Sequence, residues 1–223
     1  MEKQKVNQKV LLHTDNHLFK CLLSIFAASI LIFCMIGCSS GEWYYETSDL
    51  KQYGKYVGGA EDFMTDYINQ FFPKELSENF KDVQYTYHSC EIDEYAFEAY
   101  LEFSIEDDAL FHEHVQKATE GMVSRPFHFD GSFQEYVLYA EDRDFLYDHI
   151  QLGEERVYGK PIKTHYQIHY AKIAKILVNT EDHRIIYVAL ALHDGGGADT
   201  GILDTFFTRF GIDPKEYEML VNS

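Results

Sequence analysis

Two neighbouring segments alternate apolar and polar residues with a period of two. They cover residues 83–90 and 95–105, and only the short polar link 91–94 separates them. A period of two is typical of strands with one buried face, so we predict a β-hairpin. In the second segment one face is entirely apolar: Tyr95, Phe97, Ala99, Leu101, Phe103 and Ile105. We expect this face in the core and the alternate residues Glu98, Glu102 and Ser104 outside it.

A second hairpin is predicted further along, from residues 166–178 and 184–192. The run 185–192 is apolar on both faces, which is typical of a central strand that is covered on both sides. Residues 134–140 alternate as well and predict one more strand. The stretch 141–163 is polar and rich in turn-forming residues, so we expect mostly loop there.

Helical periodicity marks four further segments. Residues 60–72 carry apolar positions at i, i+3, i+4 and i+7, and Pro73 follows them. A second helix begins at Asp107 or Asp108 and runs to about residue 120. Its stripe is formed by Leu110, Phe111, His114, Val115 and Ala118. A third is capped by Asp199 and ends at Gly211, and a last short helix starts at Asp213-Pro214.

This order of elements predicts an α+β fold. The economical arrangement is a single antiparallel β-sheet built from two hairpins plus an extra strand, with helices packed mainly on one face. The chain shows no internal repeat and no low-complexity segment. We therefore predict one domain over residues 60–223.

The N-terminal part of the chain has a different pattern. Four lysines up to Lys20 precede the uncharged run CLLSIFAASILIFCMIGC, which ends at Cys38. A basic segment, an apolar segment and a small-residue boundary make up a secretory signal. The boundary Met35-Ile36-Gly37-Cys38 resembles the lipobox of bacterial lipoproteins. That resemblance implies a signal peptide over 1–37 and a lipid on Cys38, which anchors the protein to the outer face of the cell membrane.

An uncleaved membrane anchor is the alternative, because about 17 apolar residues are close to the shortest span of a bilayer. The lysines before the run and Glu42, Glu46 and Asp49 after it place the rest of the chain outside the cytoplasm in either case. Residues 38–59 hold several serines and glycines and predict a tether, with aromatic residues near its start: Trp43, Tyr44 and Tyr45.

Charge narrows the choice of partners. The chain has 19 basic and 37 acidic residues, and the part after the signal has a formal net charge of −20. Such a charge argues against nucleic acid as a partner and against spreading on an anionic membrane. It suits a soluble body on a tether, and it is compatible with an envelope protein of opposite charge or with a cation.

The spacing of several short motifs resembles a group of small Gram-positive bacterial lipoproteins of unknown function. The motifs are Phe72-Pro73, Tyr85-Thr86-Tyr87, Tyr100-Leu101-Glu102, Arg184-Ile185-Ile186-Tyr187-Val188 and Phe210. The resemblance covers the exported part and implies location and fold, with no catalytic residue. Cys90 is the one cysteine after Cys38, so the domain has no intrachain disulfide and must be held together by its core.

Histidines are the first candidates for a metal site. His112-Glu113-His114 lacks the second ligand of a zinc-protease helix, because Gln116 stands in its place. His112 and His114 would also lie about 200° apart around a helix. His165 and His169 would be one turn apart on a helix but about 13 Å apart on a strand. The alternation around them favours the strand, so we expect no metal.

The most distinctive loop is Asp194-Gly195-Gly196-Gly197-Ala198-Asp199. Its glycines permit close approach of a ligand, and its carboxylates, with Asp204, could bind Ca²⁺. It matches neither an EF-hand nor a repeated calcium-binding motif. A strand-to-helix connection with Asp199 as N-cap explains it as well, and we favour that interpretation.

We find no serine nucleophile elbow, phosphate-binding loop or Cys-x-x-Cys motif. The sequence therefore predicts a lipid-anchored binding or interaction module of the cell envelope, without cofactor or catalytic residues. The alternative is an envelope hydrolase with a site near His193, Asp194 and Asp199, at the end of the predicted central strand.

Overall fold

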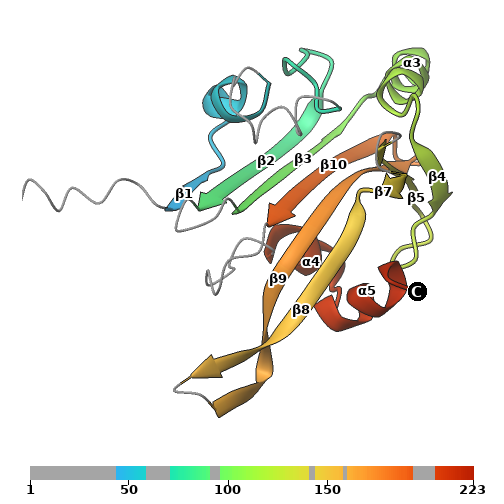
Figure 1. The fold of residues 1–223 in the computed structure, drawn as a ribbon. Helices are drawn as coiled ribbons and strands as arrows, with labels where there is room; N and C mark the ends of the chain where they lie inside the picture. Colours follow the sequence, from blue (N-terminus) through green and yellow to red (C-terminus); the bar gives the residue numbers. More distant parts are fainter. Residues whose placement is uncertain (1–43, 59–70, 91–95, 141–143, 158–159, 193–203) are drawn as a thin grey trace, which may run out of the picture. The chain divides into compact units, whose positions relative to one another are not determined.

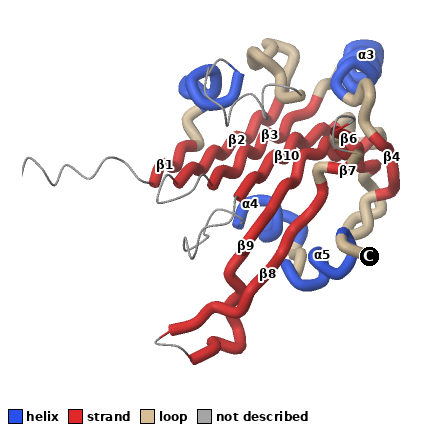
Figure 2. Tube along the Cα trace, in the orientation of Figure 1, coloured by secondary structure: helices blue, strands red, loops and turns tan. Residues whose placement is uncertain are grey.

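The computed structural model describes residues 44–58, 71–90, 96–140, 144–157, 160–192 and 204–223. All of them belong to one compact unit that spans Trp43–Ser223. An eight-stranded antiparallel sheet forms its centre, and short helices pack against the sheet (Figures 1 and 2). The predicted α+β class with a single antiparallel sheet is confirmed.

The strands follow one another in space in an order that differs from their order in the chain. That order is β1 (Tyr44–Thr47), β2 (Lys81–Cys90), β3 (Ala96–Ser104), β10 (Arg184–Leu192), β9 (Lys160–Asn179), β5 (Gln134–Val137) and β4 (Val123–Pro126). β8 (Asp148–Val157) also pairs with β9, beyond the part of β9 that pairs with β5. A separate pair is formed by β6 (Tyr139–Ala140) and β7 (Phe145–Leu146).

Both predicted hairpins are present, as β2–β3 and β9–β10. β10 pairs with β3 on one side and β9 on the other, and Ile185 to Leu190 are all buried, so the predicted central strand is confirmed. β9 confirms the strand over residues 166–178. A bulge lies opposite Gln151 and Leu152, which pair with Tyr170 and Ile168, and His169 is the extra residue.

The prediction of a loop over residues 141–163 is wrong for its described part. β8 occupies Asp148–Val157 and β9 already starts at Lys160. The far ends of these strands pair only with each other and extend away from the other strands (Figure 1). A strand outside the two packed layers needs no apolar face, so it leaves no alternating pattern in the sequence.

The folded unit begins earlier than the sequence predicted. Residues 44–58, assigned to the tether, form β1 and two short helices, η1 (Leu50–Gln52, a 3₁₀-helix) and η2 (Gly54–Gly58, a π-helix). β1 pairs with β2 over its full length, and Tyr53 and Val57 are buried in the core. The tether therefore cannot extend through this stretch.

The sheet has a packed core on each face. On the first face, aromatic residues dominate, including Tyr53, Phe71, Phe72, Tyr85, Phe97, Phe103, Phe111 and Tyr187. On the second face, α4 (Asp204–Phe210) and α5 (Pro214–Val221) cover the sheet through Phe206, Phe207 and Tyr217. The expectation that Phe97, Leu101 and Phe103 face the core is confirmed. Glu98 and Glu102, expected outside it, are only 0% and 3% exposed, because these helices cover their face.

Helix ends follow the predicted capping residues where they are described. Asp107 caps α3 (Asp108–Ala118) by accepting a hydrogen bond from the N–H of Leu110 at 2.9 Å. Asp213 caps α5 in the same way, and Gly211, at φ +61°, ends α4. The predicted helix over 60–72 lies outside the described residues apart from its last two positions, as does the stretch 199–203.

Candidate functional site

The residues that the sequence singled out lie mostly outside the described part of the chain. This holds for Cys38, and for the loop of Asp194, Gly195, Gly196, Gly197 and Asp199 together with His193. Among the described residues, no helix is long and apolar enough to cross a membrane. The same part of the chain contains no group of three or more His, Cys, Asp or Glu side chains placed to hold a metal ion.

The two histidines of α3 turn to different surroundings, as predicted. His112 Nε2 lies 3.4 Å from the carboxylate of Asp108 at the solvent-exposed side of the helix. His114 Nε2 lies 2.7 Å from the hydroxyl of Tyr187 on β10. Only His114 therefore faces the interior, and it leads to the most promising site in the described structure.

A pocket of about 440 Å³ opens beside His114, between α3 and the first face of the sheet; we call it the aromatic pocket. Its size falls in the range of small-molecule sites. Its lining comes from the segment before β2, from α3 and from β10: Phe71, Phe72, Pro73, Lys74, Glu75, Phe80, His114, Lys117, Ala118 and Tyr187. Segments far apart in the sequence thus meet at one cavity.

Flat rings form the inner surface of the aromatic pocket. Tyr187 lies in the middle, with the ring centroids of Phe72 and Phe71 5.3 and 6.3 Å away. Phe80 stacks on Phe103 at 3.8 Å and meets the His114 ring edge to face at 5.3 Å. Such pairs lie within the favourable range of aromatic contacts, so the inner surface is held in one arrangement by its own packing.

His114 and Tyr187 form the polar element of this surface. Burial, reinforced by the positive charge of Lys117, lowers the pKa of His114 to about 4. Burial raises the pKa of Tyr187 above its ordinary value. Both groups are therefore neutral near pH 7, and together they carry one O–H and one N–H. Their mutual hydrogen bond uses one of these hydrogens, and the tautomer of His114 decides which of the two groups keeps the other.

At neutral pH the polar pair of the pocket is suited to hydrogen bonding rather than to proton transfer. A general base works best when its pKa is near the working pH, and His114 lies well below it. Among the described residues that line the aromatic pocket there is no serine, threonine or cysteine to act as a nucleophile. The one lining carboxylate, Glu75, is exposed at the edge. The pocket has the size and the mixed apolar and polar lining that are common in ligand sites.

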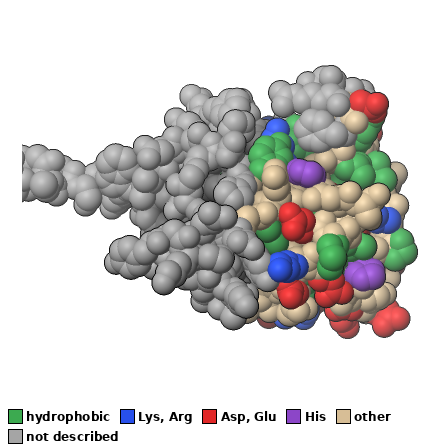
Figure 3. All heavy atoms as spheres, turned by 60° about the horizontal axis from the view of Figure 1, so that its bottom comes forward, with side chains coloured by type: hydrophobic (Ala, Val, Ile, Leu, Met, Phe, Trp, Pro, Cys, Tyr) green, Lys and Arg blue, Asp and Glu red, His purple; other side chains and the backbone are tan. Residues whose placement is uncertain are grey.

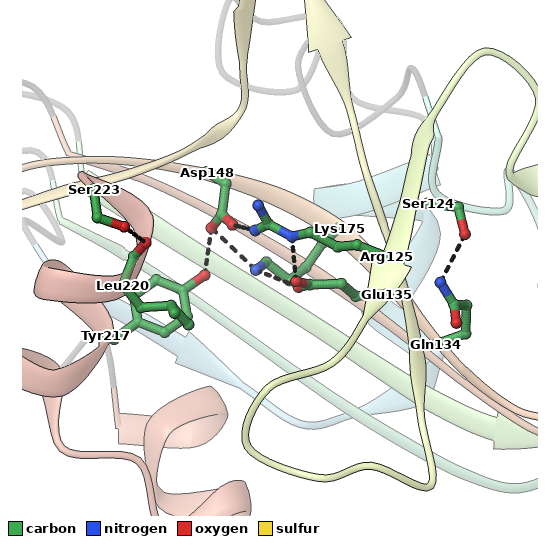
Figure 4. A network of polar contacts seen from close by, with 9 residues as sticks. All are labelled: Ser124, Arg125, Gln134, Glu135, Asp148, Lys175, Tyr217, Leu220 and Ser223. Carbon is green, nitrogen blue, oxygen red and sulfur yellow. Dashed lines mark hydrogen bonds and ion pairs between the residues drawn. The ribbon is translucent and has the colours of Figure 1, made fainter.

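A second polar centre lies on the opposite face of the sheet, between β4, β5, β8, β9 and α5 (Figure 4). Lys175 Nζ contacts Glu135 at 2.9 Å and Asp148 at 3.0 Å, although its side chain is only 1% exposed. Arg125 bridges the same two carboxylates, and the Tyr217 hydroxyl donates to Asp148. Two positive and two negative charges balance here, so we interpret this buried ion network as structural.

Two further buried glutamates tie β3 to α4. Glu98 accepts a hydrogen bond from the N–H of Phe206 at 3.1 Å, and His88 lies 3.5 Å from its other oxygen. Burial raises the pKa of Glu98, and the contact with Glu98 raises that of His88. Glu102 contacts Arg209 at 3.1 Å and Arg184 at 3.3 Å. These contacts fix α4 on the sheet, and each of the two glutamates has a histidine or arginine nitrogen within 3.5 Å.

Sequence reasoning missed the aromatic pocket, although one signal pointed to it. His114 occupies a position in the apolar stripe of α3, where a polar side chain needs a buried partner. The partner, Tyr187, is 73 positions away, and periodicity carries no information on such contacts. Glu98 gave a comparable signal on β3, as a carboxylate opposite an unbroken apolar face.

Comparison with known proteins adds no family to this picture. No family model, no curated protein and no solved structure matches the chain.

Proposed function

We propose that this protein is a lipoprotein, held on the outer face of the cell membrane by a lipid on Cys38, whose domain binds a small molecule without transforming it. The aromatic pocket is the observation that carries the binding role. It combines about 440 Å³ of space with a buried aromatic floor, one neutral hydrogen-bonding pair and a charged edge. An apolar cavity with a few convergent polar groups is the usual form of a ligand site.

The anchor is supported by the N-terminal sequence. The basic segment, the uncharged run and the boundary Gly37-Cys38 have the order of a lipoprotein signal. A domain with a formal net charge of −20 is repelled by anionic lipid. A tether near the membrane and an acidic body that stays off its surface are mutually consistent.

Binding is favoured over hydrolysis by the protonation state of the pocket. His114, with a pKa of about 4, is neutral at pH 7 and donates or accepts a hydrogen bond without taking up a proton. No described residue of the lining offers a nucleophile for it to activate. The hydrolase alternative near His193, Asp194 and Asp199 gains no support from the described residues.

A ligand screen against a pair of variants tests this proposal. The full-length protein in neutral phosphatidylcholine nanodiscs is screened by thermal unfolding with a library of neutral, anionic and cationic fragments. Ala118→Phe places a ring in the pocket, and Leu110→Phe puts the same ring on the exposed side of α3 as a control. A fragment present at about 100 times its Kd should add roughly 2.7 kcal/mol of stability.

Pocket ligands should stabilise the wild type and Leu110→Phe but not Ala118→Phe. If every stabilising fragment acts equally on all three proteins, the aromatic pocket is not the binding site and the proposal is wrong. Near-ultraviolet circular dichroism of the aromatic core verifies that Ala118→Phe is folded before the comparison is made.

A further inference from the structure

Among the described residues that line the aromatic pocket, two lysines and one glutamate lie at its mouth. Lys74, Glu75 and Lys117 are exposed, whereas Phe72 and Tyr187 on the floor are only 4% and 1% exposed. Within the described ranges, neither lysine ammonium forms an ion pair or a hydrogen bond. The described residues of the mouth thus carry a formal charge of +1, although the whole chain has a formal net charge of −18.

This local reversal of charge reaches the inside of the pocket. The positive charge of Lys117 contributes to the lowered pKa of His114, so its field acts at the floor as well as at the mouth. On the face drawn in Figure 3, by contrast, acidic and basic side chains are mixed with apolar ones. A positive mouth in an acidic protein favours a negatively charged ligand.

The aromatic floor of the pocket favours a flat ligand, in addition to the preference of the mouth for a negative charge. Tyr187 and Phe71 lie nearly parallel, with 20° between their ring planes, and Phe72 is tilted by 50° against Tyr187. A flat ring that enters the pocket can contact the edges of these rings in the T-shaped geometry that aromatic groups prefer. The His114–Tyr187 pair is the polar element of this surface.

We propose that the aromatic pocket binds a small planar aromatic molecule with one anionic group, such as a carboxylate. The ring packs on Phe71, Phe72 and Tyr187, and the anion stays at the mouth, near Lys74 and Lys117. The carboxylate thereby keeps part of its hydration, and its burial costs little. This assignment rests on the proposed function, because it names the ligand class of the same site.

Three probes with the same ring system test the assignment: 2-naphthoate, 2-naphthamide and 2-naphthylmethylammonium. Each is titrated calorimetrically into the full-length protein in neutral nanodiscs, with protein-free nanodiscs as the blank. We expect 2-naphthoate to bind about fivefold more tightly than the amide and the ammonium compound to bind most weakly, because exposed ion pairs contribute modestly.

Substitutions that change the charge of the mouth should change the Kd of the anionic probe and leave that of the neutral probe unchanged. Lys74→Gln and Lys117→Gln should each raise the Kd of 2-naphthoate about two- to fivefold and leave that of 2-naphthamide unchanged. Glu75→Gln should lower the Kd of 2-naphthoate about twofold. Lys51→Gln, an exposed lysine outside the pocket, is the matched control and should change neither. All four changes are at exposed positions, so the fold is preserved.

The outcomes separate the two proposals. If 2-naphthamide binds as tightly as 2-naphthoate and Ala118→Phe abolishes both, the pocket binds ligands but the anionic class is wrong. If 2-naphthoate still binds to Ala118→Phe and is insensitive to the lysine variants, it binds elsewhere and the pocket itself is refuted as its site. Absence of binding by all three probes overturns the aromatic anion, and the fragment screen then decides on the pocket.

Discussion

Lys175 is the one cation that lies fully inside the buried ion network, so replacing it by methionine tests the structural role of that network. Its ammonium contacts Glu135 at 2.9 Å and Asp148 at 3.0 Å. Methionine fills a similar volume with no charge, which keeps the packing against Phe206 and Tyr217 nearly constant. The variant therefore retains the two carboxylates and loses half of their positive partners.

The expected loss of stability follows from the remaining charges. Removing one partner of a buried ion pair costs about 3–5 kcal/mol, because a buried charge is left uncompensated. Arg125, whose side chain is 37% exposed, still contacts both carboxylates. We therefore expect the lower end, about 3 kcal/mol, and a fall in Tm of about 6–12 °C for a domain of this size.

Thermal unfolding of the full-length protein at pH 7, with Lys172→Met on the same strand as control, measures this loss. Adding Glu135→Gln to Lys175→Met restores charge balance, so the double variant should be more stable than the sum of the single effects predicts. Additive single effects would refute the charge-balance argument.

Four shorter predictions concern other parts of the chain. Leu101→Ala should lower the free energy of unfolding by about 2–5 kcal/mol, since Leu101 is 0% exposed; a loss below about 1 kcal/mol in urea denaturation would contradict its place in the core. Cys38→Ala should block maturation, leaving a full-length precursor on immunoblots that no longer incorporates labelled palmitate. Because burial lowers the pKa of His114 to about 4 in the folded state, its contribution to stability is complete above about pH 6.5 and is lost as the pH falls towards 4; denaturation of His114→Asn across that window should show a shallower pH dependence than the wild type. If the loop at Asp194 is only a connector, calcium should leave Tm unchanged, and a calcium-dependent rise that disappears in Asp194→Asn would show otherwise.

Strands with one apolar face were predictable from the sequence, because the polarity of each residue in such a strand indicates whether its side chain is buried. Phe97, Leu101 and Phe103 alternate with polar residues, and all three lie in the core. β10 was predictable for the same reason, as a run that is apolar on both faces. β8 was not, because its outer part pairs only with β9 and needs no apolar side. Periodicity reveals which face is covered, and a strand without a covered face has no pattern to read.

Charged residues in the core on the second face of the sheet show a second kind of burial that the sequence pattern does not predict. Glu98 and Glu102 fall in the polar phase of β3, which predicted exposure, yet α4 covers them. Arg184 and Arg209, two of the cations around them, come more than 80 residues later in the chain. Burial of a charge depends on such distant partners. The polar positions of a strand can therefore be exposed or buried, and only the fold decides between the two.

The aromatic pocket owes its existence to the same kind of distant polar contact. His114 stands where an apolar side chain of α3 would pack directly on the sheet, and it reaches Tyr187 by a hydrogen bond instead. A hydrogen bond contributes about 1 kcal/mol of net stability, less than full burial of a large apolar side chain would. The helix is thus held by contacts at Phe111 and His114, while the space lined by Ala118 and Phe72 stays open. A polar residue in the stripe with a cavity beside it sacrifices some stability of the helix, and this supports the proposed binding role.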